Sequence, residues 1–132
     1  MTFLCDTNII SELARPQPNP SVITWSQSWE SIILSVITVE EITYGINAKP
    51  NDRILTWFHN FLNNHCIILP INAEIAQRCG ELRGQLRQRG MTRSQADMLI
   101  AVTAEVHQLT LVTRNVRDFE GCNISIFNPF SI

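Results

Sequence analysis

Phe3-Leu4-Cys5-Asp6-Thr7-Asn8-Ile9-Ile10 is a short apolar run that ends at an acidic residue and leads into an amphipathic segment. This order is typical of a strand followed by a helix in a parallel α/β sheet. We therefore expect a strand over Thr2–Cys5 and a helix over Asn8–Ala14. Asp6 would then stand at the carboxyl end of the strand, which is the edge where such sheets bind their ligands.

The same alternation of short apolar runs and longer amphipathic segments continues along the chain. Further strands are expected at Ile32–Ser35, Cys66–Leu69, Thr110–Val112 and Ile124–Phe127. Further helices are expected at Ser21–Glu30, Thr38–Asn47, Asn51–Asn63, Ala73–Arg89 and Ser94–His107. Three alternating prolines make Arg15–Pro20 a loop, and Gly90 is placed to end a helix. The pattern predicts a three-layer α/β/α fold around a central parallel sheet of about five strands.

The composition is that of one folded domain. The chain has 132 residues, of which 45% are hydrophobic and 17% are charged, which gives enough apolar surface for a core and too little charge for disorder. We expect residues 1–132 to form a single domain. The net charge of −2 excludes a protein that coats nucleic acid non-specifically, because such proteins carry a large positive excess. A local basic patch is compatible with this charge.

The chain carries no sequence sign of export or of membrane insertion. Its apolar runs are shorter than the roughly 18 residues that a membrane-spanning helix needs, and the N-terminal residues lack the basic region of a signal peptide. The cysteines at positions 5, 66, 79 and 122 are scattered without a C-x-x-C spacing, so they are expected to be small apolar residues. We expect a cytoplasmic protein with reduced thiols and no membrane contact.

Four carboxylates stand just after predicted strands or at the start of the helices that follow. Asp6 and Asp118 follow strands, whereas Glu41 and Asp97 lie in the first turns of helices. If the strands are parallel, these positions share one end of the sheet. Carboxylates gathered in one cleft repel one another and raise each other's pKa. A divalent cation relieves this repulsion, and oxygen ligands suit Mg²⁺ or Mn²⁺.

Each carboxylate also has a purely structural interpretation, which the residues alone leave open. Asp6 suits the N-cap of the first helix. Glu41 suits the N3 position of a capping box that begins at Thr38, and Asp97 suits the acidic end of a second such box. Asp118 suits a turn. The expected position of all four at one sheet edge is what favours a shared chemical role.

Together these segments resemble the PIN domain, and more narrowly the VapC-type toxins of bacterial type II toxin–antitoxin systems. The resemblance covers Phe3–Phe130, which is nearly the whole chain. The matching segments follow the order and spacing of the family and are Leu4–Glu12, Leu34–Ile42, Asp97–Ala104, Leu111–Phe119 and Phe127–Pro129. Phe130 stands where many relatives have Trp, a difference that concerns packing.

The resemblance implies an Mg²⁺- or Mn²⁺-dependent endoribonuclease that hydrolyses RNA phosphodiester bonds with a metal-activated water. The catalytic residues that it implies are the metal-holding Asp6, Glu41, Asp97 and Asp118, the water-binding Asn115, and the orienting Thr7 and Thr113. As the toxin of such a pair, the protein would form a homodimer and bind a small VapB-like antitoxin. No motif indicates which RNA is cut.

Arginine residues supply a candidate RNA-binding surface. Half of the ten Lys and Arg residues fall between Arg78 and Arg93. Guanidinium groups match the geometry of phosphate. A solvated helix face is the alternative interpretation of such a run. The residues expected to bind RNA are Arg87, Arg89, Arg93 and Arg114.

Other proteins that gather acids at strand ends fit less well. A receiver domain requires a lysine after a late strand, and a haloacid-dehalogenase-type phosphatase requires Asp-x-Asp after the first strand; this chain has neither. A catalytically silent PIN-like module that binds RNA or protein is the remaining alternative. Such modules usually lose one or more of the acids, and all four are retained here, which favours the enzyme.

Overall fold

A computed structural model describes residues 2–29 and 31–131 of the chain. Its centre is a five-stranded sheet in the order β3-β2-β1-β4-β5, and every pair of neighbouring strands is parallel. The strands are β1 (Phe3–Cys5), β2 (Ile32–Ser35), β3 (Cys66–Leu69), β4 (Thr110–Val112) and β5 (Ile126–Phe127). The parallel sheet of about five strands that the sequence predicts is confirmed.

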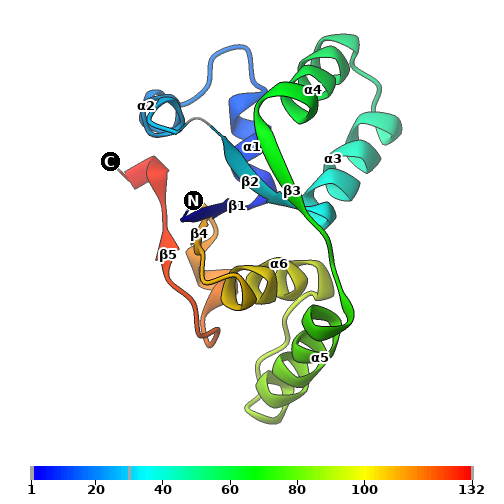
Figure 1. Ribbon diagram of the computed structural model, residues 1–132, viewed down its shortest axis with the longest axis vertical. Coiled ribbons are helices and arrows are strands. Elements are labelled where there is room, and N and C mark those ends of the chain that lie inside the picture. Colours follow the sequence, from blue (N-terminus) through cyan, green and yellow to red (C-terminus); the bar gives the residue numbers. More distant parts are fainter. Residues whose placement is uncertain (1, 30, 132) are drawn as a thin grey trace.

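Helices cover both faces of this sheet, with α1 to α4 on one face and α5 and α6 on the other (Figure 1). The α-helices of the described residues are α1 (Thr7–Leu13), α2 (Pro20–Gln27), α3 (Val36–Ala48), α4 (Asp52–Asn64), α5 (Ala73–Gln88) and α6 (Gln95–Val106). The short 3₁₀ helices are η1 (Val116–Phe119) and η2 (Pro129–Ser131). Among the described residues, no helix is long and apolar enough to cross a membrane.

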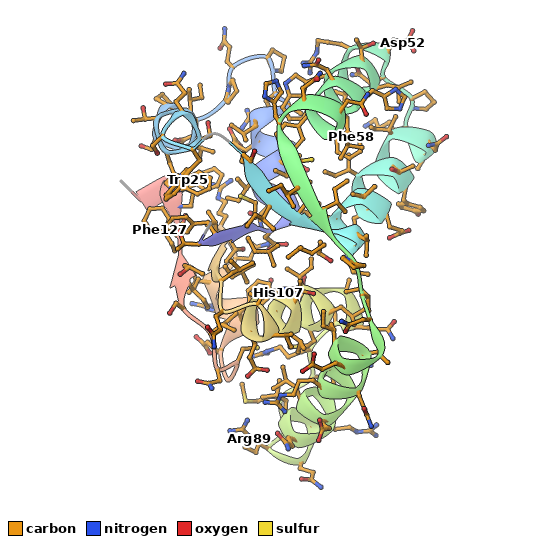
Figure 2. The ribbon with its side chains drawn as sticks, in the orientation of Figure 1. Trp25, Asp52, Phe58, Arg89, His107 and Phe127 are labelled. Atoms are coloured by element: carbon orange, nitrogen blue, oxygen red, sulfur yellow. The ribbon has the colours of Figure 1, made fainter. Side chains whose placement is uncertain are left out.

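The core consists of two apolar layers, one on each face of the sheet. In β1, Leu4 packs into the layer under α5 and α6, whereas the next residue, Cys5, packs into the layer under α1 to α4. Successive strand residues point to opposite faces, so strands without polar side chains fill both layers. Phe58 of α4 anchors the second layer and is only 2% exposed (Figure 2).

The elements differ from the predicted ones only at their ends. Strand β5 is two residues shorter than predicted and begins at Ile126. Helix α3 begins at Val36, two residues earlier than predicted, because Ser35 caps it by accepting a hydrogen bond from the backbone N–H of Ile37 at 3.0 Å. Helix α2 ends at Gln27, and Glu30, its predicted end, lies outside the described residues.

Two helix ends show why glycine and proline stand where they do. Gly90 follows α5 with a φ of +78°. Its N–H donates to the carbonyl of Arg87 at 2.9 Å, and the N–H of Met91 donates to that of Leu86 at 2.8 Å, which is a Schellman motif. Pro20 is the first residue of α2 rather than the last of the loop, because that position needs no N–H donor.

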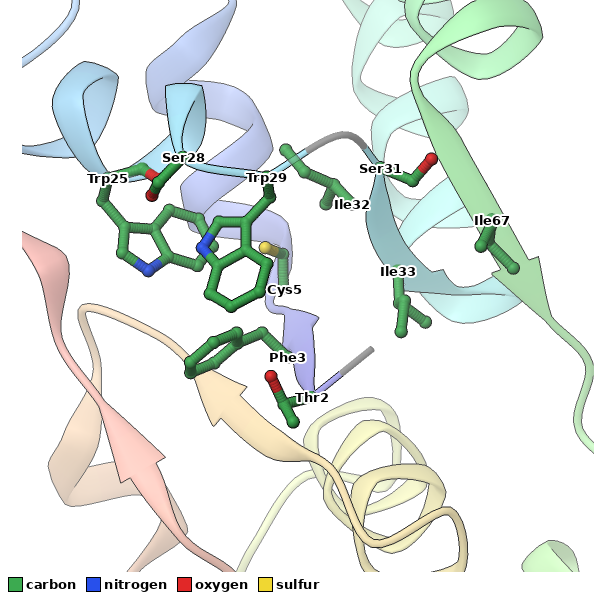
Figure 3. A pocket seen from close by; sticks show the side chains of 10 residues that line it. All are labelled: Thr2, Phe3, Cys5, Trp25, Ser28, Trp29, Ser31, Ile32, Ile33 and Ile67. Atoms are coloured by element: carbon green, nitrogen blue, oxygen red, sulfur yellow. The ribbon is translucent and has the colours of Figure 1, made fainter.

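An aromatic cavity of about 320 Å³ lies where β1 and β2 begin, at the edge opposite to their carboxyl ends (Figure 3). Phe3 packs edge-on against Trp25 and Trp29, with ring centroids 5.9 and 4.6 Å apart. Cys5 also lines the cavity, and burial raises the pKa of its thiol. Its described lining contains no Asp, Glu, His, Lys or Arg.

The order of the strands places the expected ligand-binding crevice at their carboxyl ends. The chain leaves β1 into α1 and leaves β4 toward η1, and these neighbouring strands form the point where the sheet order reverses. Ligands of open parallel sheets bind in the crevice at such a point. Asp6 directly follows β1, and Thr113 directly follows β4.

Candidate active site

Asp6 lies at the middle of the carboxyl edge and caps α1. Its Oδ1 accepts a hydrogen bond from the backbone N–H of Thr7 at 2.8 Å. Its Oδ2 accepts one from Thr113 Oγ1 at 2.8 Å and one from Asn8 Nδ2 at 3.1 Å. The side chain is buried, with 4% exposed. The capping role is thus confirmed, and it leaves open a second role for the same carboxylate.

Burial raises the pKa of Asp6 to about 6, although the hydrogen bonds from Thr113 and Thr7 act in the opposite direction. The negative charges of Asp97 and Glu41 contribute smaller parts of the same rise. Such an effect requires the carboxylates to be close neighbours. Three of the acids that the sequence singles out therefore meet at this edge, although they come from three separate helices or their caps.

Glu41 reaches the edge from the second turn of α3. Its Oε1 accepts a hydrogen bond from Thr7 Oγ1 at 2.6 Å, and the same hydroxyl lies 3.1 Å from Thr38 Oγ1. The alternative in which Thr38 and Glu41 form a capping box is wrong, because Ser35 caps the helix and Thr38 is buried inside it. The carboxylate of Glu41 is instead tied to the segment that carries Asp6.

Asp97 lies in the first turn of α6, where Ser94 accepts a hydrogen bond from its backbone N–H at 3.1 Å. Burial raises the pKa of Asp97, a contact with Ser94 lowers it, and the charge of Asp118 raises it. Asp118 is itself exposed on η1. Asn115 precedes η1, and its backbone N–H donates to Thr113 Oγ1 at 3.0 Å.

A cleft of about 420 Å³ opens over this edge of the sheet. Its described lining consists of Asp6, Thr7, Asn8, Ser11, Glu12, Arg15, Glu41, Asp97 and Asn115. Of the site residues expected from the sequence, Asp118 is not part of this lining, but its charge raises the pKa of Asp97, which is part of it. Thr113 is fully buried beneath Asp6. The rest of the predicted acidic and orienting residues share one cleft.

Residues 3–121 match the PIN domain family. The chain belongs to this family. This PIN domain is 35% identical to the toxin FitB of Neisseria gonorrhoeae, with 97% of this chain and 98% of that protein covered. It is 33% identical to VapC ribonuclease Y4jK of Sinorhizobium fredii, with 97% of each protein covered. The resemblance to VapC-type toxins is confirmed.

Solved structures agree with this assignment over the full length of the PIN domain. The crystal structure of FitAcB from Neisseria gonorrhoeae matches with a TM-score of 0.85 at 34% identity, covering 99% of this chain and 100% of that one. A toxin–antitoxin complex from Klebsiella pneumoniae matches with a TM-score of 0.77 at 26% identity, covering 99% of this chain and 100% of that one. The predicted PIN-like fold is therefore confirmed.

Four residues of α1 and its end complete the cleft of the PIN domain, and the sequence had not singled them out as site residues: Ser11 and the three residues Asn8, Glu12 and Arg15. Asn8 donates from Nδ2 to Asp6 and to Thr113, and its Oδ1 accepts from the backbone N–H of Arg114 at 3.1 Å. Glu12 and Arg15 form an ion pair at 3.1 Å. The three residues recur at the helical spacing i, i+4, i+7, which was the available signal that they share a face.

The four arginines expected to bind RNA are not among the described residues that line the cleft. Arg87 and Arg89 are exposed near the end of α5, where Figure 2 shows Arg89 at the tip of the molecule. Arg93 donates from Nη2 to a backbone carbonyl at 3.3 Å. The guanidinium of Arg114 lies 4.6 Å from the ring centroid of Phe130. Their role in binding RNA stays a prediction.

The chemistry of the cleft fits a hard divalent cation. Asp6, Glu41 and Asp97 supply carboxylate oxygens, which Mg²⁺ and Mn²⁺ prefer, and neither histidine nor cysteine belongs to the described lining. Over residues 2–29 and 31–131, no three acidic, histidine or cysteine side chains lie close enough together to hold a metal ion as they stand. Burial is the main cause of the raised pKa of Asp6, and the charges of Asp97 and Glu41 add to it.

Proposed function

We propose that this PIN domain is an Mg²⁺- or Mn²⁺-dependent endoribonuclease that acts as the toxin of a toxin–antitoxin pair. One observation carries the proposal: Asp6, Glu41 and Asp97 line one cleft, where burial and, to a smaller extent, the charges of Asp97 and Glu41 raise the pKa of Asp6. The names of the relatives, a toxin and a VapC ribonuclease, support the same activity. RNA is thus the proposed substrate, cut by hydrolysis within the strand.

The residues that would hold the metal are Asp6, Glu41, Asp97 and, from the margin of the cleft, Asp118. When bound, a divalent ion lowers the pKa of a water ligand and offsets the charge of the phosphate. The carboxyl group of Asp6 holds a proton up to a pH of about 6. Above that pH, the cleft gains a negative charge that favours the uptake of a cation.

Thr113 and Thr7 are proposed to fix the orientation of the acids. Thr113 Oγ1 donates to Asp6 Oδ2 and accepts from the backbone N–H of Asn115, so its position is fixed on both sides. Thr7 joins the cap of α1 to Glu41 through its hydroxyl. Groups that hold metal ligands in place raise metal affinity and activity. Asn115 is proposed to bind the attacking water from the cleft wall.

We infer the binding of a small antitoxin from an apolar groove of about 300 Å³ beside the cleft. The groove runs between α1, α3 and α4 and shares Thr7 and Glu41 with the cleft lining. Its apolar walls are formed by Ile10, Ile42, Ile46, Ile54, Trp57 and Phe58. An amphipathic segment of a partner protein fits such a groove. A homodimer of the toxin is part of the same proposal.

Incubation of the purified protein with total RNA tests the activity. Cleavage is expected with Mg²⁺ or Mn²⁺ and not with EDTA, and Asp6→Asn and Asp97→Asn are each expected to abolish it because a carboxylate ligand is lost. Circular dichroism checks that both variants fold. Binding of RNA by the wild-type protein without cleavage in either metal would instead support a silent binding module. Cleavage that persists in EDTA would refute the metal dependence.

A further inference from the structure

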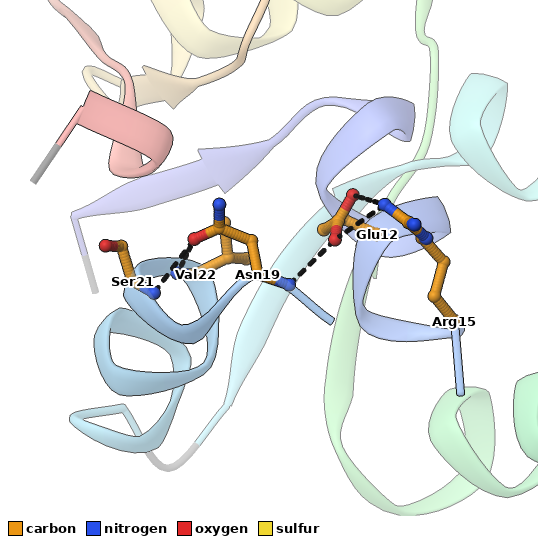
Figure 4. A network of polar contacts seen from close by, with 5 residues as sticks. All are labelled: Glu12, Arg15, Asn19, Ser21 and Val22. Carbon is orange, nitrogen blue, oxygen red and sulfur yellow. Dashed lines mark hydrogen bonds and ion pairs between the residues drawn. The ribbon is translucent and has the colours of Figure 1, made fainter. Parts of the chain in front are cut away.

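A buried carboxylate on α1 holds an arginine at the rim of the cleft. Glu12 is 6% exposed, and both of its carboxylate oxygens accept hydrogen bonds from Arg15 Nη1, at 3.1 and 3.2 Å. Glu12 Oε2 also accepts the backbone N–H of Asn19 at 2.8 Å. Figure 4 shows the three residues as one network between α1 and the start of α2. Arg15 is therefore held from one side only.

The opposite side of the guanidinium is open. The side chain of Arg15 is 63% exposed, and its hydrogen bonds to the described residues all leave from Nη1. Nε and Nη2 therefore stay available as donors. Arg15 is also the sole basic residue in the described lining of the cleft, which it shares with the carboxylates of Asp6, Glu41 and Asp97.

A phosphodiester that enters this cleft meets several negative charges. A divalent cation offsets part of that repulsion at the reacting phosphate, but RNA carries a phosphate at every nucleotide. The planar guanidinium presents paired donors that match phosphate oxygens. An arginine already held by a buried carboxylate loses less side-chain entropy on binding than a free one.

We propose that Arg15 binds a phosphate of the RNA strand in the cleft and that Glu12 is the positioning residue that holds it there. This inference rests on the proposed function, and it names the substrate contact that the α5 arginines do not provide inside the cleft. A phosphate of the strand would be bound by Nε and Nη2 of Arg15, while Nη1 stays on Glu12.

A purely structural role for the network is the competing explanation. Glu12 joins α1 to Asn19, the N-cap of α2. The Oδ1 of Asn19 accepts the backbone N–H groups of Ser21 and Val22 at 2.9 and 3.3 Å. In that case, variants of the network would lower the melting temperature without a specific effect on RNA binding. The salt dependence of binding separates the two explanations, because it counts phosphate contacts.

The test measures the Kd of a short single-stranded RNA at several salt concentrations, with Asp97→Asn as the background so that the RNA is not cut. Arg15→Gln is expected to weaken binding about tenfold, as for the loss of a charge-assisted hydrogen-bond pair. The slope of log Kd against log salt is expected to fall by about 0.7, the value for one phosphate contact of a single strand. Arg15→Lys keeps the charge but not the paired donors, and its Kd is expected to lie between those of the protein with Arg15 and of Arg15→Gln.

Asn19→Ala is the matched structural control. It removes the side-chain cap of α2 and keeps the backbone N–H that Glu12 accepts, so it is expected to lower the melting temperature and leave the salt slope unchanged. Glu12→Gln removes the charge that holds the arginine. When Arg15→Gln is added to Glu12→Gln, it is therefore expected to weaken RNA binding by less than the tenfold seen when Glu12 is present. An equal loss of RNA affinity in Asn19→Ala and Arg15→Gln would overturn the inference.

The same measurements distinguish a failure of this inference from a failure of the proposed function. If the wild-type protein cleaves RNA and Arg15→Gln binds with an unchanged Kd and slope, the inference on Arg15 is wrong and the ribonuclease stands. If the wild-type protein binds RNA with a slope that Arg15→Gln reduces but does not cut it, the phosphate contact stands and the ribonuclease is wrong.

Discussion

Glu41 shows how much the role of one residue depends on a contact that is remote in sequence. Its position three residues after Thr38, the predicted N-cap, suits the acidic end of a capping box equally well in the sequence. The hydrogen bond from Thr7 at 2.6 Å, across 34 residues of chain, separates the two roles. Glu40 is next to it and is exposed on a different face of α3, with Thr43, Tyr44 and Asn47, because adjacent helical residues do not share a face.

Glu41→Gln is therefore expected to fold normally and to lose ribonuclease activity by a factor of at least about 100, the order seen when a metal-site residue loses its function. The amide oxygen of Gln still accepts the hydrogen bond from Thr7, so the fold is retained. Glu40→Gln is the matched control and is expected to keep its activity. The measurement is the initial rate of RNA cleavage with Mg²⁺. Equal rates in the two variants would remove Glu41 from the site.

The raised pKa of Asp6 predicts an unusual pH dependence of stability in the metal-free protein. Its pKa is about 6 in the fold and about 3.9 in the unfolded chain. The folded state therefore binds the extra proton between these values, and the free energy of unfolding falls as the pH rises through this range. The loss is complete about one pH unit above the folded-state pKa and is on the order of 3 kcal/mol.

Melting curves in EDTA between pH 4.5 and pH 7.5 test this linkage. The melting temperature of the wild-type protein is expected to fall with rising pH, and Mg²⁺ at pH 7.5 is expected to restore part of the loss because it binds the folded state. Asp6→Asn has no such proton to lose, so its curve is expected to be flatter. A wild-type melting temperature that rises over this range would contradict the assignment.

At the scale of elements, the glycines near the end of α5 give a matched pair. Gly90 has a φ of +78°, a conformation that costs an L-residue roughly 1–2 kcal/mol. Gly84 lies inside α5, and a Cβ added there meets no atom within 4 Å. Gly90→Ala is expected to lower the free energy of unfolding by about 1 kcal/mol, and Gly84→Ala to raise it by about 0.5–1 kcal/mol. Urea denaturation measures both free energies of unfolding. Changes of the same sign in the two variants would contradict the Schellman motif at the end of α5.

The elements show which parts of the fold the sequence determines locally. Apolar runs bounded by polar residues located β2, β3 and β4 correctly, since a buried parallel strand is apolar on both faces. The start of α3 was misplaced, because Ser35 and Thr38 are both good caps and only packing against the sheet selects Ser35. Strand β5 was predicted too long, since its length depends on pairing with β4 alone.

The candidate site likewise contains residues that the local sequence predicts and residues that it does not. Asp6, Glu41 and Asp97 were predicted because each follows a strand or opens a helix, and parallel topology then brings them together. Glu12 and Arg15 were missed because they lie after the first turn of α1, where an acid–base pair is ordinarily a solvated surface feature. The burial of Glu12 depends on the backbone of Asn19, which no local pattern reveals.

At the scale of the whole molecule, the groove between α1, α3 and α4 links partner binding to the cleft, since Thr7 and Glu41 line both. Gly45 lies in this groove, and a Cβ added there meets no atom within 4 Å. A larger side chain at this position would therefore fill the groove without disturbing the fold. Gly80, on the exposed surface of α5, has the same open surroundings and provides the control.

Gly45→Leu is expected to keep ribonuclease activity and to lose neutralisation by the antitoxin, because the leucine occupies the space that an apolar partner segment needs. Gly80→Leu is expected to keep both, and both variants exchange glycine for a better helix former, so their stability should not fall. Co-expression with the cognate antitoxin, followed by growth assays and co-purification, measures the effect. Full neutralisation of Gly45→Leu would place the antitoxin elsewhere on the molecule. Loss of toxicity in Gly45→Leu expressed alone would instead show that the substitution reaches the cleft.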